Sequence, residues 1–215
     1  MAQKVGVVLS GGGADGVAHI GVLKALEENH IPIDYIVGTS MGAFIAGMYA
    51  SGYSVKQIES FITSEKFKKA AEGDVEEKYI FYLKKKENDA SWISFKFAPD
   101  TVLSTSLPTN FISPVPIDFT LVELFANSSA AANYNFDSLM IPFRCVGSDV
   151  TAKKQVIFNK GDVGQCIRAS MSYPFYIKPI LIDGDLYFDG GLYNNFPIDV
   201  LYRDFKPDVI VGSSV

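Results

Sequence analysis

The chain has 215 residues, of which 48% are hydrophobic and 20% are charged, and its formal net charge is −5. This composition is typical of a folded globular domain, and the length suits one well-packed domain better than two. The acidic balance argues against a nucleic-acid partner, which usually requires a basic surface.

The first fifty residues alternate between strand and helix patterns. A continuous apolar run at residues 5–9 predicts a strand that is buried on both faces, and residues 33–37 predict a second buried strand. Apolar residues recur at helical spacing over residues 17–29, and a second helix is expected over residues 43–51. Strand, turn and helix, repeated twice, predict a parallel sheet with right-handed crossovers.

The pattern loosens between residues 65 and 135. Prolines punctuate this stretch, aromatic residues surround Lys84, Lys85 and Lys86, and a short helix is expected over residues 121–125. We predict an irregular insertion within a single domain of residues 1–215, at a place where a substrate lid or mouth would be built. The lysine triplet has two interpretations: peripheral contact with a lipid surface, or an ordinary solvated charge run beside core aromatics.

The α/β pattern returns in the last third of the chain. Strands are expected at residues 141–146, 156–158, 177–182, 186–188 and 209–211, with a helix over residues 163–172. No apolar stretch has the length of about 18 to 20 residues that crosses a membrane. Because strand patterns begin and end abruptly at the two termini, we expect the chain to be a fragment of a longer protein.

Cysteine and histidine are scarce. Cys145 and Cys166 are too few for a disulfide framework and are predicted to be buried free thiols. His19 and His30 have no partners at metal-ligand spacing, so we expect neither a metal site nor a cofactor.

The turn after the second predicted strand has the pattern of a nucleophile elbow. Gly38-Thr39-Ser40-Met41-Gly42 matches G-x-S-x-G, and a buried strand precedes it while a helix follows. The tight turn requires small residues on both sides of the serine. Ser40 is therefore the candidate nucleophile, and the alternative is a structural turn whose serine caps the helix.

A carboxylate is the best candidate for the base, because no histidine follows Ser40 and His19 is expected to pack beside the first helix. Asp189 ends an apolar run and is followed by two glycines, which places it at a strand end, where ligand sites of α/β sheets lie. Partial burial would raise its pKa and make it a stronger base. The alternative is a plain turn. Asp183 and Asp185 are assigned to a hairpin turn.

The glycine-rich segment after the first strand is the candidate oxyanion hole. Gly11, Gly12 and Gly13 leave backbone N–H groups unobstructed at a helix N-terminus, and the N–H of Met41 would complete the set.

The same segment also spells G-x-G-x-x-G, the dinucleotide fingerprint, so a nucleotide-binding module is a competing interpretation. That fingerprint requires an acidic residue at the end of the second strand, whereas Asp34 begins it.

Taken together, the motifs at residues 11–16, 38–42 and 189–191 resemble those of the patatin-like phospholipase family, and the flanking residues 18–23, 168–174 and 192–197 extend the resemblance over nearly the whole chain. The resemblance implies a three-layer α/β/α fold with a mostly parallel central sheet. It also implies a metal-independent lipid acyl hydrolase with a Ser-Asp dyad, acting on lipid or acyl-ester substrates. By position, Ser40 is the nucleophile and Asp189 the base.

One residue departs from the family pattern, which usually has arginine or lysine where this chain has Asp15. If this carboxylate points outward, its effect is small. If it points inward, neutral esters become better substrates than anionic phospholipids, and a catalytically weak lipid-binding homologue is the alternative function.

Some bacterial members of the family are exported as part of a larger protein. The resemblance therefore suggests export to the periplasm or outer membrane, with an ordinary cytoplasmic enzyme as the alternative.

Overall fold

The computed structural model describes residues 3–74, 94–96, 104–106 and 110–215. Within them, a seven-stranded sheet has the order β7-β8-β5-β2-β1-β9, and β6 pairs with β5 beside this path. The strands of this sheet are β1 (Val5–Leu9), β2 (Tyr35–Thr39), β5 (Phe143–Asp149), β6 (Lys154–Phe158), β7 (Ile180–Ile182), β8 (Asp185–Asp189) and β9 (Val209–Ser213). A separate antiparallel pair consists of β3 (Ser94–Lys96) and β4 (Ser104–Ser106).

Four consecutive strands of the order, β5, β2, β1 and β9, run parallel, which confirms the predicted mostly parallel sheet. β1 pairs in parallel with β2 and β9, and β2 pairs in parallel with β5. The strands β6, β7 and β8 are antiparallel additions at the β5 side of the sheet. The alternation of strand and helix along the first fifty residues thus corresponds to one parallel crossover, β1-α1-β2, followed by α2, which begins the connection to the next parallel strand, β5.

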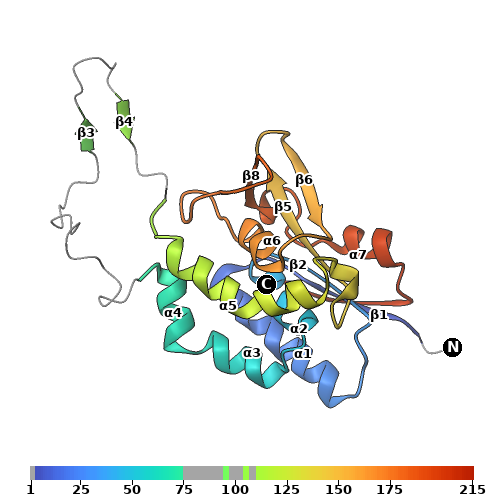
Figure 1. The fold of residues 1–215 in the computed structure, drawn as a ribbon. Coiled ribbons are helices and arrows are strands. Elements are labelled where there is room, and N and C mark those ends of the chain that lie inside the picture. The colour runs from blue at the N-terminus through green and yellow to red at the C-terminus, as the bar shows by residue number, and fades with distance from the viewer. Residues whose placement is uncertain (1–2, 75–93, 97–103, 107–109) are drawn as a thin grey trace.

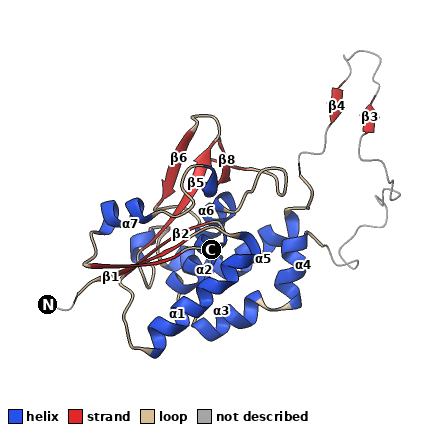
Figure 2. Ribbon diagram, turned by 180° about the vertical axis from the view of Figure 1, so that it is seen from behind, coloured by secondary structure: helices blue, strands red, loops and turns tan. Residues whose placement is uncertain are grey.

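Helices cover both faces of the sheet and form three layers (Figures 1 and 2). The helices are α1 (His19–Glu28), α2 (Met41–Ala50), α3 (Val55–Ile62), α4 (Glu65–Glu72), α5 (Val115–Ala131), α6 (Val163–Ser170) and α7 (Ile198–Phe205). Helices α1 to α6 contribute to the larger core on one face, whereas α7 packs on the other. Short 3-10 turns occur at η1 (Gly13–Ala18), η4 (Phe136–Ser138) and η5 (Gly190–Leu192).

The two cores follow from the alternation of side chains along each strand. In β1, Val7 and Leu9 face the larger core, while Val8 lies in the smaller core with Val200 and Leu201 of α7. Because both faces are covered, these strands are apolar throughout, as the sequence pattern indicated.

The predicted insertion needs a correction at both of its ends. Residues 65–72 form the regular helix α4 instead of irregular structure, and the short helix expected over residues 121–125 is part of the longer α5, residues 115–131. Phe67 and Phe125 both pack against Phe44 of α2, with ring centroids 5.3 and 6.1 Å apart, so these helices belong to the main core. The lysine triplet at residues 84–86 lies outside the described residues.

The two cysteines and the start of the first helix can also be compared with the predictions. Cys145 and Cys166 are free and buried, as predicted. The helix expected from residue 17 begins instead as the 3-10 turn η1 and becomes α-helical at His19. No helix in the described ranges combines the length and the apolar character needed to cross a membrane.

Candidate active site

Ser40 occupies a sharp turn between β2 and α2. Its backbone has φ 53° and ψ −123°, a conformation that non-glycine residues rarely adopt. A Cβ atom at Gly38 would lie 2.5 Å from the carbonyl carbon of Gly42, and one at Gly42 would collide with the carbonyl oxygens of Leu9 and Ser10. Both flanking glycines are therefore required by close approach of the backbone, as in a nucleophile elbow.

The side chain of Ser40 does not cap the helix. No side-chain cap bond occurs at the start of α2, and the Ser40 Oγ atom instead donates to Asp189 Oδ2 at 2.7 Å. The alternative interpretation of Ser40 as a helix cap is therefore wrong for this geometry.

Strand pairing explains how residues 149 positions apart come together. Strand β5 pairs with β6 along one edge, so β2 and β8 share its other edge. Val146 pairs with Thr39, and the next residue, Gly147, pairs with Asp189. Since β2 runs parallel to β5 and β8 antiparallel to it, the two strands meet end to end. Asp189 therefore reaches the carboxyl edge of the parallel strands from an antiparallel strand, a route that sequence reasoning did not anticipate.

Hydrogen bonds fix the Asp189 carboxylate. Oδ2 accepts from Ser40, and Oδ1 accepts from the Gly191 N–H at 2.7 Å. The residue is only 4% exposed. Burial raises the pKa of Asp189 above the ordinary aspartate value, while the bonds from Ser40 and Gly191 act in the opposite direction. A higher pKa makes the carboxylate a stronger base than a solvated one.

Three buried serines that sequence reasoning missed support this pair. Ser170 Oγ accepts the Ser40 N–H at 2.9 Å, and Ser148 Oγ donates to the Asp189 carbonyl at 2.7 Å. The carbonyl of Ser172 accepts the Asp189 N–H at 2.9 Å. Ser170 and Ser172 lie in the segment 168–174 quoted for the family resemblance, which was the available signal.

The glycine loop lies beside Ser40, but its three N–H groups are not equivalent. The Gly11 N–H donates to the Asn195 carbonyl at 3.0 Å, and Asn195 Nδ2 donates back to the Gly11 carbonyl at 3.2 Å. Within the described part of the chain, the N–H groups of Gly12, Gly13 and Met41 have no acceptor. These three donors are thus the ones available to a ligand.

His19 supports the glycine loop, and its two ring nitrogens bond to partners other than Ser40. Its Nδ1 lies 2.7 Å from Ser213 Oγ, and its Nε2 lies 2.9 Å from the carbonyl oxygen of Ser10. The ring is fully buried, and burial lowers the pKa of His19. A neutral ring that joins the loop to β9 agrees with the expectation that His19 packs beside the first helix.

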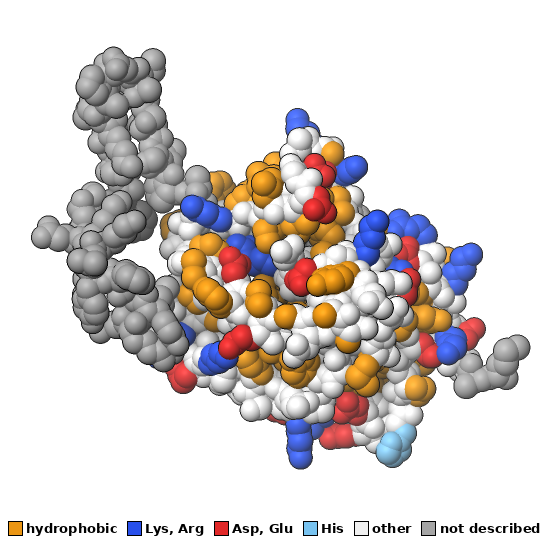
Figure 3. All heavy atoms as spheres, viewed as in Figure 1, with side chains coloured by type: hydrophobic (Ala, Val, Ile, Leu, Met, Phe, Trp, Pro, Cys, Tyr) orange, Lys and Arg blue, Asp and Glu red, His pale blue; other side chains and the backbone are white. Residues whose placement is uncertain are grey.

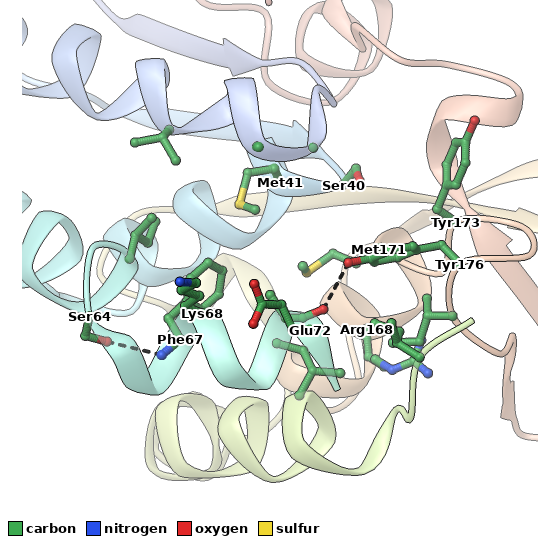
Figure 4. A pocket seen from close by; sticks show the side chains of 18 of the residues that line it. Ser40, Met41, Ser64, Phe67, Lys68, Glu72, Arg168, Met171, Tyr173 and Tyr176 are labelled. Atoms are coloured by element: carbon green, nitrogen blue, oxygen red, sulfur yellow. Dashed lines mark hydrogen bonds between the residues drawn. The ribbon is translucent and has the colours of Figure 1, made fainter. Parts of the chain in front are cut away.

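A cavity of about 500 Å³ opens beside Ser40. Figure 4 shows Ser40 and Met41 on one side of it, Lys68 and Glu72 of α4 on another, and Tyr173 and Tyr176 on a third. Its wall is mainly apolar, with side chains that include Ile62, Phe67, Ile112, Ile117, Met171 and Ile177. Such a volume and wall are typical of sites for small apolar ligands.

Asp15 is exposed and is not part of the cavity wall. Because solvent screens an exposed charge, we expect Asp15→Arg to change kcat/KM for a neutral ester less than about threefold. Steady-state kinetics on p-nitrophenyl butyrate measure this, with Asp15→Asn as the control that removes charge without adding a cation. A tenfold gain in Asp15→Arg would instead mean that this carboxylate acts on the reaction centre.

The fold and site define an α/β protein whose elbow serine is hydrogen-bonded to a buried aspartate at the carboxyl edge of a parallel sheet. The sequence profile described as "Patatin-like phospholipase" matches residues 7–202. The chain belongs to the patatin-like phospholipase family.

Two curated relatives show the extent of the similarity. Lysophospholipase NTE1 of Kluyveromyces lactis is 32% identical over 196 residues, which make up 91% of this chain and 12% of that protein. Patatin-like phospholipase domain-containing protein 7 of Mus musculus is 30% identical over 214 residues, which make up 98% of this chain and 13% of that protein. The chain therefore spans only a small part of the length of the relatives it matches.

A solved structure shares the fold. VipD from Legionella pneumophila has a TM-score of 0.54 and 18% sequence identity, and the match covers 98% of this chain and 49% of that one. The patatin-like α/β architecture inferred from sequence is confirmed.

The nucleotide-binding interpretation receives no support from Asp34. Its carboxylate accepts from Lys4 Nζ at 2.6 Å and from the Val5 N–H at 2.8 Å. These contacts hold Asp34 at the edge of the sheet opposite the glycine loop, since Val5 begins β1 and the loop follows its end.

Proposed function

We propose that this protein hydrolyses carboxylic ester bonds of lipids, with Ser40 as the nucleophile and Asp189 as the base. The 2.7 Å hydrogen bond from Ser40 Oγ to the buried Asp189 carboxylate, beside an apolar cavity, carries the proposal. Family membership supports the same class of reaction.

In the first half of the reaction, Ser40 Oγ attacks the ester carbonyl carbon and its proton passes to Asp189 Oδ2. The resulting oxyanion accepts hydrogen bonds from the N–H groups of Gly12, Gly13 and Met41, helped by the N-terminal dipole of α2. Asp189 then gives the proton to the leaving alcohol, and the acyl group remains esterified to Ser40. We leave Gly11 out of the oxyanion hole because its N–H already donates to Asn195.

In the second half, a water molecule gives a proton to Asp189 and attacks the acyl carbon. Collapse of the second tetrahedral intermediate breaks the bond to Ser40 Oγ, which recovers the proton from Asp189. The products are a fatty acid and free enzyme. This chain's residues supply the nucleophile, the base and the oxyanion donors, so the scheme needs no cofactor.

We further propose that lipids with one acyl chain are substrates, since the relatives include proteins named lysophospholipase and the cavity beside Ser40 is mainly apolar. The purified chain is expected to release palmitate from 1-palmitoyl lysophosphatidylcholine and p-nitrophenol from p-nitrophenyl palmitate. Mass spectrometry of the released palmitate and absorbance of the released p-nitrophenol, both at neutral pH, test this prediction. If calorimetry shows that palmitate binds but neither ester is hydrolysed, the proposed enzyme is rejected, and the chain is an acyl-binding domain instead.

A further inference from the structure

Four exposed aromatic side chains form a group at the mouth of the Ser40 cavity. Phe111 is 71% exposed, Tyr173 63%, Phe175 71% and Tyr176 45%. We call this group the aromatic rim. Figure 3 shows hydrophobic side chains at the surface of the face that carries α5 and α6.

The rim is one structural unit, although its residues come from two segments of the chain. The Phe111 N–H donates to the Phe175 carbonyl at 2.8 Å, and the Ile112 N–H donates to the Tyr176 carbonyl at 3.1 Å. The Tyr176 hydroxyl donates to the Ala71 carbonyl of α4 at 3.1 Å, a bond drawn in Figure 4. These bonds join both segments to the helix on the other side of the cavity.

The rim borders the cavity without filling it. Tyr173 and Tyr176 line the cavity and are also exposed to solvent, so they stand at its opening. Phe111 and Phe175 are not part of the wall and direct most of their surface outward. The rim therefore borders one side of the cavity opening, where an apolar chain can enter from outside.

Phe175 is held in an unfavourable conformation. Its φ of 65° is in the left-handed region, which bulky residues rarely occupy, and burial within the domain does not compensate because the ring is largely exposed. Backbone strain of this kind concentrates at functional sites. Here the strained residue presents an apolar ring to the surroundings.

Charge near the rim is mixed, with a small excess of cations. Helix α4 carries Lys66, Lys68 and Lys69 as well as Glu65 and Glu72, and Lys178 follows the rim. Because Lys66 is paired with Glu123 and the whole chain has a net charge of −5, these lysines do not form the dense basic cluster that an anionic membrane attracts. Aromatic side chains, and tyrosine in particular, prefer the interface between lipid and water.

We propose that the aromatic rim docks on the surface of a zwitterionic lipid bilayer and places the cavity mouth where a lipid can leave the bilayer for Ser40. The choice of a lipid bilayer as the partner of the rim rests on the proposed function, because a lipid esterase must take its substrate from a lipid phase. The rim contacts the interface through its phenylalanine and tyrosine rings, and electrostatic attraction contributes little.

The test compares vesicle binding of two variants, each in a Ser40→Ala chain so that no substrate is consumed. Phe111→Ser with Phe175→Asn removes two rings, and asparagine tolerates the left-handed backbone. Flotation with phosphatidylcholine vesicles is expected to show a partition coefficient lower by about tenfold or more. Tyr202→Ser on α7 is the matched control: it is 62% exposed, lies on the opposite face, and should bind as the parent does.

Activity gives a second measurement in chains that retain Ser40. The double variant should hydrolyse soluble p-nitrophenyl butyrate within about twofold of wild type, because neither ring lines the cavity. Its turnover of p-nitrophenyl palmitate presented in phosphatidylcholine vesicles should fall together with vesicle binding.

Several results would overturn the proposal: undiminished vesicle binding by the double variant, a requirement for anionic lipid, or a wild-type dimer that the substitutions dissociate in light scattering. The vesicle measurement uses an inactive chain, so it is independent of the proposed function. If vesicle binding depends on the rim but no ester is hydrolysed, the proposed docking surface stands and the proposed esterase activity is rejected.

Discussion

Replacing Ser40 with alanine is expected to lower kcat/KM for p-nitrophenyl butyrate by about 10⁴-fold or more. The substitution removes the only atom that forms the covalent bond to the acyl group in the proposed scheme, while the oxyanion donors and the cavity remain. The same variant should lose labelling by a fluorophosphonate, which mass spectrometry of the intact chain detects as the absence of one adduct.

Ser51→Ala is the matched control for this experiment, since Ser51 stands at the other end of α2. Its buried hydroxyl oxygen has no hydrogen-bond partner among the described residues, so its removal should cost neither activity nor stability. Ser51→Ala should retain the wild-type melting temperature, whereas Ser40→Ala should melt somewhat earlier because the buried Asp189 carboxylate loses one donor. Residual labelling of Ser40→Ala at another serine, with activity retained, would reject Ser40 as the nucleophile.

The sequence predicted the central fold well because its strands are buried on both faces. Residues 5–9 are a continuous apolar run, residues 35–37 are a second short one, and turns bound both, which leaves little ambiguity about a parallel sheet. The elbow was equally clear, because the glycines flanking Ser40 have a steric reason that is visible in the motif itself.

The route by which Asp189 reaches Ser40 was not predictable from local patterns. A strand such as β8 carries no signal for its direction, and only pairing with β5 shows that β2 and β8 meet end to end. The bond from Gly11 to Asn195 was hidden for the same reason, since it joins residues 184 positions apart. Helix α4 was missed, and α5 was predicted only over residues 121–125, because prolines and charges obscured their apolar faces.

Replacing Asp189 with asparagine is expected to lower kcat/KM by about 10³- to 10⁴-fold. The amide oxygen can still accept from the Gly191 N–H, but the side chain can no longer take the proton of Ser40. In the wild type, kcat/KM should fall as pH decreases through the pKa of Asp189, because only the carboxylate is a base. Burial raises that pKa, so the inflection should lie above the ordinary value of about 3.9.

The melting temperature of Asp189→Asn distinguishes loss of the base from loss of the fold. Because the folded state raises the pKa of Asp189, the carboxyl stabilises the fold most below its ordinary pKa, and this contribution is lost as pH rises through the raised value. At neutral pH the buried carboxylate opposes folding, so Asp189→Asn should melt no earlier than wild type. Asp185→Asn, at the exposed start of the same strand, is the control and should retain full activity. If Asp189→Asn is inactive and also melts earlier than wild type at neutral pH, the carboxylate supports the structure. If Asp189→Asn remains active, Asp189 is rejected as the base.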